Sequence, residues 1–214
     1  MRNWIMGLVV LAVAAGPLTA GVVPIGEFTG DLYEGFENLG TPGGYPGPFS
    51  IMDGGATFND VFANMLMIAY SLQSGLTGVS IYPYNGNLMG GSVTGCAVID
   101  FTTPVEKFGG YIGAADDLSG GMVTFRDEMG LVLDTQPLTL TMGQWAWYGW
   151  ESDVPFGSIE IWGAASPGLG VVFDDLQATV PEPAGLSLLA IGAAALLGSR
   201  RGVRGGAALC GKGR

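Results

Sequence analysis

The chain has 214 residues, a formal net charge of −11 and no histidine. The lack of histidine excludes Ser-His-Asp and Cys-His catalysis within the chain, and histidine-ligated zinc as well. The acidic balance disfavours nucleic acid and anionic lipid as partners.

The first 20 residues have the layout of a secretory signal peptide. Arg2 supplies a positive end, and an apolar run follows from Trp4 to Ala15. Gly16-Pro17 then breaks the run before a cleavage site at Leu18-Thr19-Ala20. An uncut membrane anchor is disfavoured because the run is short and broken. We therefore expect export by the secretion machinery, with residues 21–180 as one mature domain.

The expected mature domain is more acidic than the whole chain. It holds two basic and 18 acidic residues, which gives a net charge of −16. Such a surface suits solubility outside the cell and attracts divalent cations. Cys96 is the only cysteine in the domain, so no internal disulfide can form. In its apolar run we interpret Cys96 as a small buried residue.

Short runs of apolar and β-branched residues between glycine-rich turns predict an all-β domain. Asp127-Glu128-Met129-Gly130 predicts a hairpin turn with Gly130 at positive φ, and Asn85-Gly86-Asn87 predicts another turn. The stretch 61–72 fits either a helix or a strand. Because no helices intervene, we expect an antiparallel β-sandwich, jelly-roll-like, and not a parallel α/β fold. The expected short strands are 79–84, 93–101, 108–114, 121–126, 131–135, 138–141, 144–150, 158–162, 171–173 and 176–180.

One expected strand carries aromatic residues on both of its faces. Trp145 and Trp147 share one face, while Tyr148 and Trp150 share the other. Exposed rings would form a platform for stacking sugars, whereas buried rings would fill the core. Both faces cannot belong to the core of a two-layer sandwich, so we expect one pair to be partly exposed. The tyrosines at 82 and 84 are further candidates for sugar binding.

Two segments resemble the ends of carbohydrate-binding-module-like jelly rolls. They are Tyr33-Glu34-Gly35-Phe36-Glu37-Asn38 near the start and Val172-Phe173-Asp174-Asp175-Leu176 near the end. The resemblance implies that the terminal strands are neighbours and that acidic residues from both hold a structural calcium ion. Ca²⁺ takes about six to eight oxygen ligands. We therefore expect Glu37, Asp174 and Asp175 as ligands; alternatively, one aspartate caps a turn and the other faces solvent.

The C-terminal region, residues 181–204, has three parts in order. Pro181-Glu182-Pro183 precedes an apolar run at 184–198, and Arg200 and Arg201 follow it. The run is short for a bilayer span, which usually takes about 20 residues, although flanking arginines can snorkel to the interface. The arginines place residues 205–214 in the cytoplasm.

This arrangement resembles the PEP-CTERM sorting signal of Gram-negative bacteria. The resemblance implies recognition by an exosortase and cleavage near the Pro-Glu-Pro motif. It also implies that residues 184–199 anchor the protein in the inner membrane before processing. The alternative is an ordinary C-terminal transmembrane anchor.

From these observations we expect a non-catalytic protein of the cell surface or extracellular matrix, in contact with exopolysaccharide. One alternative is a carbohydrate-binding-module-like protein with a defined glycan ligand. The other is a glycoside hydrolase or lyase that uses carboxylates alone, for which Glu151 and Glu160 are the candidates.

Overall fold

The computed structural model describes residues 21–75, 77–115, 118–163 and 170–182. The expected signal peptide, Pro183, the apolar run 184–198 and the arginines that follow it lie outside the described residues. Within the described ranges, no helix has the length and hydropathy needed to cross a bilayer.

Antiparallel β-strands make up nearly all of the regular structure in the described part of the chain. The exception is a short 3-10 turn, η1 (Met52–Gly54). Strands β7 and β8 form a small sheet of their own, and the other strands join into one continuous sheet. The strands are β1 (Val22–Pro24), β2 (Leu32–Glu34), β3 (Gly43–Pro46), β4 (Phe49–Ile51), β5 (Ala56–Asp60), β6 (Met65–Ala69), β7 (Leu72–Gln73), β8 (Ser80–Ile81), β9 (Met89–Ser92), β10 (Cys96–Ala114), β11 (Leu118–Arg126), β12 (Val132–Leu140), β13 (Trp145–Trp162) and β14 (Val171–Thr179).

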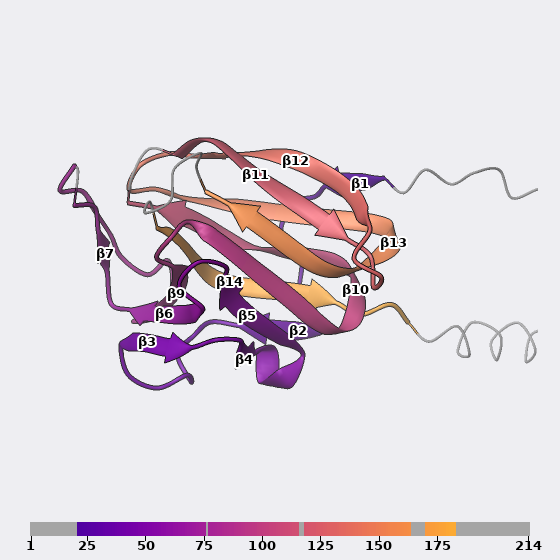
Figure 1. Cartoon of the computed structure of the whole chain (residues 1–214), viewed down its shortest axis with the longest axis horizontal. Coiled ribbons are helices and arrows are strands. Elements are labelled where there is room, and N and C mark those ends of the chain that lie inside the picture. Colours follow the sequence, from indigo (N-terminus) through magenta and orange to yellow (C-terminus); the bar gives the residue numbers. More distant parts are fainter. Residues whose placement is uncertain (1–20, 76, 116–117, 164–169, 183–214) are drawn as a thin grey trace, which may run out of the picture.

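The two longest strands, β10 and β13, pair with each other and organise the fold (Figure 1). The start of β10 pairs with the end of β13, from Cys96↔Trp162 to Asp100↔Ser158. The later part of β10 pairs with the start of β13, up to Gly113↔Trp145. The register shifts between these two parts, and such irregularities bend strands and let them pass from one layer to another. The bent pair therefore contributes to both layers of a β-sandwich.

Each layer is completed by strands on either side of this pair. In one layer, β5 lies beside β10, β11 lies beside β13, and β12 forms the edge next to β11. In the other layer, β14 lies beside β10 and is followed by β9, β6 and β3. Strand β1 also pairs with β13, and β2 pairs with β14. The pairing Glu34↔Leu176 makes the early and late strands neighbours, as the jelly-roll resemblance implies.

The core between the layers is rich in phenylalanine. Phe58 of β5 meets Phe173 of β14 with ring centroids 5.7 Å apart, and Phe125 of β11 meets Trp150 of β13 at 5.4 Å. Burial of each large side chain contributes about 1.5–3 kcal/mol of transfer free energy. The largest fully buried side chains are Phe36, Phe58, Phe108, Phe125, Phe156 and Phe173.

Three pairs of expected strands are in fact single strands. The segments 93–101 and 108–114 fall largely within β10, 144–150 and 158–162 within β13, and 171–173 and 176–180 within β14. The prolines and glycines that indicated strand ends lie at bends, through which each strand continues. In β14 the interruption is Asp175, whose φ of 47° shifts the register without ending the strand.

The connections between the long strands agree with the sequence-based predictions only in part. Within the stretch 61–72, residues 61–63 form a turn and Met65–Ala69 forms the strand β6. The hairpin from β11 to β12 is confirmed, with Gly130 at φ 81°. The expected strand 79–84 is wrong for most of its length, because only Ser80–Ile81 pairs. The residues after it belong to a loop that is held by side chains.

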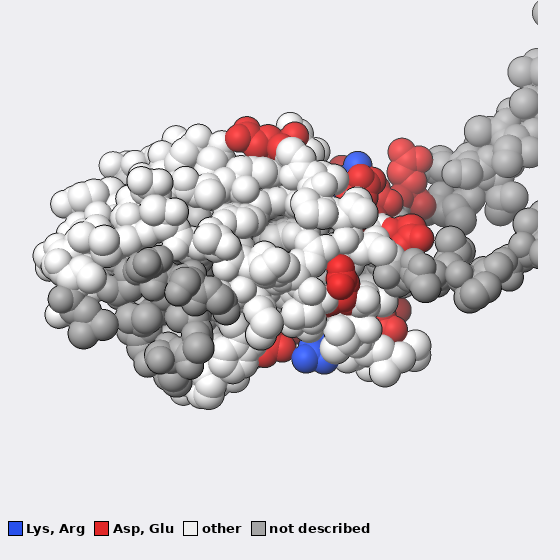
Figure 2. All heavy atoms as spheres, turned by 90° about the horizontal axis from the view of Figure 1, so that it is seen from above, with Lys and Arg blue, Asp and Glu red and all other residues white. Residues whose placement is uncertain are grey.

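Charged side chains gather at one end of the molecule. In Figure 2 the acidic residues lie over the end that holds β1 and the last residues of β14, and the opposite end is almost free of charge on the face shown. The sequence accounts for this asymmetry, because no Asp, Glu, Lys or Arg occurs between Asp60 and Asp100. That uncharged stretch forms β6 to β9.

Candidate functional site

The aromatic residues near residue 150 divide between the two faces of β13. Trp150 is only 3% exposed, and its Nε1–H donates to Gln136 Oε1 at 3.0 Å. Tyr148 stacks on Trp150 with a centroid distance of 5.9 Å and packs against the core. Trp145 and Trp147 lie on the outer face and are half-buried. Trp150 is therefore a core residue to which a sugar ring has no access, and the outer pair is the one that reaches the surface.

The indole of Trp147 packs against two glycines of the sheet. Gly109 of β10 pairs with Gly149 of β13, and a Cβ at either position would come within 2.8 Å of the indole. Phe28 and Tyr111 contact the ring edge-on, with centroid distances of 5.9 and 5.4 Å. Because both paired positions lack a side chain, the indole can rest directly on the sheet.

Trp145 has a similar support at the other end of this outer surface. Its ring carbon Cε3 would be 3.0 Å from a Cβ at Gly113, so this ring also covers a glycine. Its Nε1–H donates to the carbonyl of Tyr82 at 2.8 Å. That hydrogen bond joins Trp145 to the loop after β8, from which Tyr82 extends with 65% of its surface exposed.

Two stacked tyrosines connect the tryptophans. The rings of Tyr84 and Tyr111 lie 3.5 Å apart at an interplanar angle of 17°. Tyr84 also contacts Trp145 at 6.4 Å and remains 47% exposed. The hydroxyl of Tyr111 donates to Glu27 Oε1 at 2.6 Å, and this hydrogen bond to a carboxylate, with a further one to Tyr84, raises the pKa of Tyr111. We call this surface the aromatic face, and it comprises Phe28, Tyr82, Tyr84, Tyr111, Trp145 and Trp147.

The loop that carries two of these tyrosines, Tyr82–Leu88, is held by carboxylates. Asp174 Oδ2 accepts the backbone N–H of Asn85 at 3.0 Å. Glu37 Oε1 accepts the backbone N–H groups of Asn87 and Leu88 at 2.6 and 2.7 Å. These bonds satisfy the donors of a segment that has no strand partner of its own.

Asp175 completes this support from the bulge in β14. Its carboxylate accepts hydrogen bonds from the Tyr33 hydroxyl and, at 3.4 Å, from Asn85 Nδ2. Burial and the bond to Asp175 together raise the pKa of Tyr33. The loop is thus held by Glu37, Asp174 and Asp175, which accept hydrogen bonds from its N–H groups.

The pKa of the Asp174 carboxyl group is shifted by its surroundings. It is fully buried, and that burial raises its pKa to about 6. The N–H groups of Asn85 and Asp175 oppose the shift, while the charge of Asp175 adds to it. A buried aspartate beside a second one disfavours ionisation, because its charge is neither hydrated nor paired with a cation.

The expected calcium ligands Glu37, Asp174 and Asp175 are not gathered into one cluster of three in the described part of the chain. No three Asp, Glu or Cys side chains lie close enough together there to hold a metal ion. N–H donors already occupy Glu37 Oε1 and both oxygens of Asp174. The expected calcium ion therefore stays a prediction, which the melting temperature in calcium and in chelator would test.

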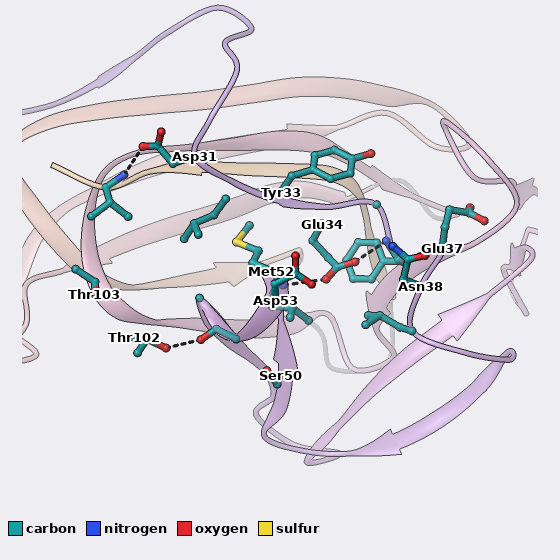
Figure 3. Close-up of a pocket in the computed structure, with 18 residues that line it drawn as sticks. Asp31, Tyr33, Glu34, Glu37, Asn38, Ser50, Met52, Asp53, Thr102 and Thr103 are labelled. Carbon is teal, nitrogen blue, oxygen red and sulfur yellow. Dashed lines mark hydrogen bonds between the residues drawn. The ribbon is translucent and has the colours of Figure 1, made fainter. Parts of the chain in front are cut away.

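A pocket of about 820 Å³ lies beside the start of β2 and η1 (Figure 3). Its acidic residues include Glu34, which is buried and accepts the N–H groups of Phe36 and Met52 at 2.7 and 2.9 Å. Asp31 at the rim accepts the N–H of Val180 at 3.2 Å. Glu34 thus serves to hold the turn η1 against β2, in a conformation where Met52 has a φ of 54°.

The two candidate glycosidase carboxylates do not face each other. Glu151 pairs with Lys107 and Glu160 pairs with Arg126, each at 3.2 Å. They are nine residues apart on β13, on opposite sides of its bend, and each faces its own cation, whereas a glycosidase pair has its carboxylates roughly 5–10 Å apart across one cleft. The structure does not bring them together as a catalytic pair.

Sequence reasoning missed two members of the aromatic face. Tyr111 alternates with Gly109 and Gly113, a pattern that marks a ring lying between glycines on the same face of a strand. This signal was available in the sequence. Phe28 lies in an irregular segment before β2 and has no such pattern around it.

No known protein family matches the sequence, and no curated protein matches it either. Among solved structures, the chain is similar to the K2 cleaved adhesin domain of Lys-gingipain, with 16% identity and a TM-score of 0.43 over 70% of this chain and 97% of that one. The K1 adhesin domain from Porphyromonas gingivalis W83 is similar at 14% identity and a TM-score of 0.43, over 71% and 98% of the two chains. A variant of a family 29 carbohydrate-binding module is similar at 9% identity and a TM-score of 0.34, over 64% and 90%. At such low scores the likeness describes a broadly similar arrangement of β-strands and nothing further.

Proposed function

We propose that this chain is a non-catalytic, exported protein whose aromatic face binds a polysaccharide chain. The observation that carries the proposal is the row of partly exposed rings on the outer surface of one layer. A pyranose presents an apolar C–H surface, which packs well against the face of an aromatic ring. No pair of facing carboxylates accompanies the row in the described part of the chain, which favours binding without cleavage.

The row of rings suits an extended ligand. Successive centroids are 6.4 Å apart from Trp145 to Tyr84, 3.5 Å from there to Tyr111, 5.4 Å on to Trp147 and 5.9 Å on to Phe28. A ligand that extends across the aromatic face would therefore meet several rings in succession. The rings are fixed by the sheet and by one another, so little side-chain entropy is lost on binding.

The charge distribution favours a neutral glycan. The domain has a net charge of −16, which would repel an anionic polysaccharide. The uncharged stretch between Asp60 and Asp100 supplies Tyr82 and Tyr84. Glu27 and Asp175 border the aromatic face, and their charges would likewise disfavour an anionic chain and leave a neutral one unaffected.

The proposed delivery follows from the two ends of the sequence. The N-terminal segment would direct export, and an exosortase would recognise Pro181-Glu182-Pro183. The protein would be held in the inner membrane before processing and would afterwards lie at the cell surface or in the extracellular matrix of a Gram-negative bacterium. Pro181 comes two residues after Thr179, the last residue of β14, so the domain and the sorting motif are almost contiguous.

Binding can be tested by affinity electrophoresis of the detergent-solubilised full-length protein in gels that contain neutral or anionic polysaccharides. Neutral glucans, mannans and xylans should retard the wild-type protein, and alginate should not. Trp147→Ala should weaken binding by about tenfold, the effect of losing one stacked ring. The matched control is Phe62→Ala, because Phe62 is 55% exposed and contacts Trp162 on the other layer. Equal retardation of Trp147→Ala and wild type would refute the proposed site.

Sorting requires a separate test in cells. Replacement of Pro181-Glu182-Pro183 by alanines should block processing of the tail and leave the unprocessed protein in the membrane fraction. Processing at the wild-type rate would refute recognition by an exosortase.

A further inference from the structure

The loop that positions Tyr84 contains the one Asn-Gly dipeptide of the sequence, Asn85-Gly86. The fold requires glycine at the second position. Gly86 has a φ of 67°, and a Cβ there would lie 2.2 Å from Glu37 Oε1. The same carboxylate accepts the next two N–H groups of the loop, so it has little room to move. Any side chain at 86 would therefore disturb the support of the loop.

The geometry around Asn85 brings two reactive groups together. The backbone N–H of Gly86 donates to Asn85 Oδ1 at 3.0 Å, so the side-chain amide of Asn85 lies against the backbone nitrogen of Gly86. Asn85 is exposed to water, and no side chain on Gly86 shields the nitrogen.

We propose that Asn85 is a site of spontaneous deamidation, and that this modification weakens the aromatic face. The deprotonated nitrogen of Gly86 forms a bond to Asn85 Cγ, and the bond from Cγ to Nδ2 breaks. Nδ2 leaves as ammonia after taking up a proton, and a five-membered succinimide remains. Water then opens either carbonyl of the ring, which yields aspartate or isoaspartate at position 85. Water is the only co-reactant, and no oxidant or reductant takes part.

The product would conflict with the groups that hold the loop. Asn85 Nδ2 now donates to Asp175 Oδ2, and the Asn85 backbone N–H donates to the buried Asp174. A carboxylate at position 85 removes the first donor and places a third negative charge beside these two aspartates. Isoaspartate also adds a methylene group to the main chain directly after Tyr84.

Displacement of Tyr84 would reach the binding surface through ring contacts. Tyr84 stacks on Tyr111 at 3.5 Å, and the preceding Tyr82 carbonyl accepts the Trp145 indole N–H. Because the modification needs no enzyme, the fraction of molecules deamidated at Asn85 rises with the age of the protein. This second step rests on the proposed function, whereas the deamidation itself does not.

The chemistry is tested by peptide mapping of the full-length protein after warm incubation at mildly alkaline pH. Asn85 should convert roughly ten times faster than Asn87, an exposed asparagine of the same loop that is followed by Leu88. Isoaspartate-specific methylation should label the peptide that contains residue 85, and Asn85→Gln should abolish that label. Conversion of Asn85 no faster than that of Asn87 would overturn the proposed modification.

The consequence is tested with Asn85→Asp, which carries one product from the start. This variant should bind the neutral polysaccharide about tenfold more weakly than the wild-type protein and Asn85→Gln. Wild-type affinity of Asn85→Asp, in an assay where Trp147→Ala has lost affinity, would overturn the link to binding and leave the binding site intact. Unchanged binding by Trp147→Ala would instead count against the proposed function itself.

Discussion

The carboxylate of Asp174 accepts a hydrogen bond from the backbone N–H of Asn85, 89 positions earlier in the chain. This contact joins a buried charge in β14 to the loop that presents Tyr82 and Tyr84. Burial of Asp174 is unfavourable only when its carboxyl group is ionised, so the free energy of the folded state depends on pH. The hydrogen bond to Asn85 connects this titration to the loop of the aromatic face.

Stability should fall as the pH rises through the titration of Asp174. Its pKa is raised from 3.8 to about 6 in the folded protein, so between these values the folded state binds more protons than the unfolded state. The free energy of unfolding should therefore decrease from about pH 4 to pH 7, by an amount on the order of 1–3 kcal/mol from this group. Urea unfolding of the wild type and of Asp174→Asn across this range measures it. The difference between the two proteins should change with pH, and a constant difference would contradict the assignment.

Asp60 is expected to act in the opposite direction. It is fully buried, and although burial alone would raise its pKa, bonds from Thr94, Ala63 and Ser92 together lower it. Its stabilisation is thus present above the unfolded pKa and is lost as the pH falls through the lowered one. At neutral pH, Asp60→Asn should cost about 2–4 kcal/mol in urea unfolding, because some of these donors lose their acceptor. The exposed Asp53→Asn serves as the control and should change stability by less than about 0.5 kcal/mol.

Gly109→Ala should displace the Trp147 indole from the sheet. The added Cβ would lie 2.8 Å from the ring and 2.9 Å from the backbone oxygen of Tyr148, so the indole must move. We expect a changed near-ultraviolet circular dichroism spectrum and about tenfold weaker polysaccharide binding. Gly43→Ala is the control, because a Cβ at Gly43 meets no atom within 4 Å. An unchanged spectrum for Gly109→Ala would show that the ring does not rest on this glycine.

Substitution of a core aromatic residue should lower the free energy of unfolding much more than substitution of a surface one. Trp150→Ala removes a ring stacked 6.4 Å from Phe108 and in contact with Phe125, and it should cost about 3–5 kcal/mol. Tyr82→Ala should change stability by no more than about 0.5 kcal/mol, because Tyr82 is 65% exposed. A loss from Tyr82→Ala comparable with that from Trp150→Ala would contradict the division of the aromatic residues between core and surface.

Local patterns in the sequence predict the chemistry of the strands better than their length. Alternation and glycine turns identify the all-β class and the hairpin that ends at Gly130. They do not show that β10 continues from Cys96 to Ala114, because Pro104 and its neighbours look the same at a strand end and at a bend. Only the pairing of both halves of β10 with β13 distinguishes a bend from a strand end, and that pairing joins residues that are far apart in the sequence.

The candidate site was partly predictable for a similar reason. Alternation separates Trp147 from Trp150, but it cannot say which face is buried until the second layer is in place. Glu37 and Asp174 both contact the loop Tyr82–Leu88, and the strands β2 and β14 beside them are neighbours, as the jelly-roll resemblance implies. The loop that lies between them could not be foreseen, because its support comes from side chains and not from a strand partner.

The position of β14 has a mechanical consequence. β14 has β10 on one side and β2 and β9 on the other, and the chain leaves it at Thr179 towards the proposed sorting motif. A pull on that end acts along the strand, whereas the antiparallel hydrogen bonds lie across it, so the bonds are loaded together in shear and do not open one by one. A ligand on the aromatic face would pull on β10 and β13, of which β10 is the direct neighbour of β14. In a protein tethered at this end, as proposed, tension between a bound polymer and the tether would therefore pass through the β10–β14 pair, and the rest of the fold would carry little of it.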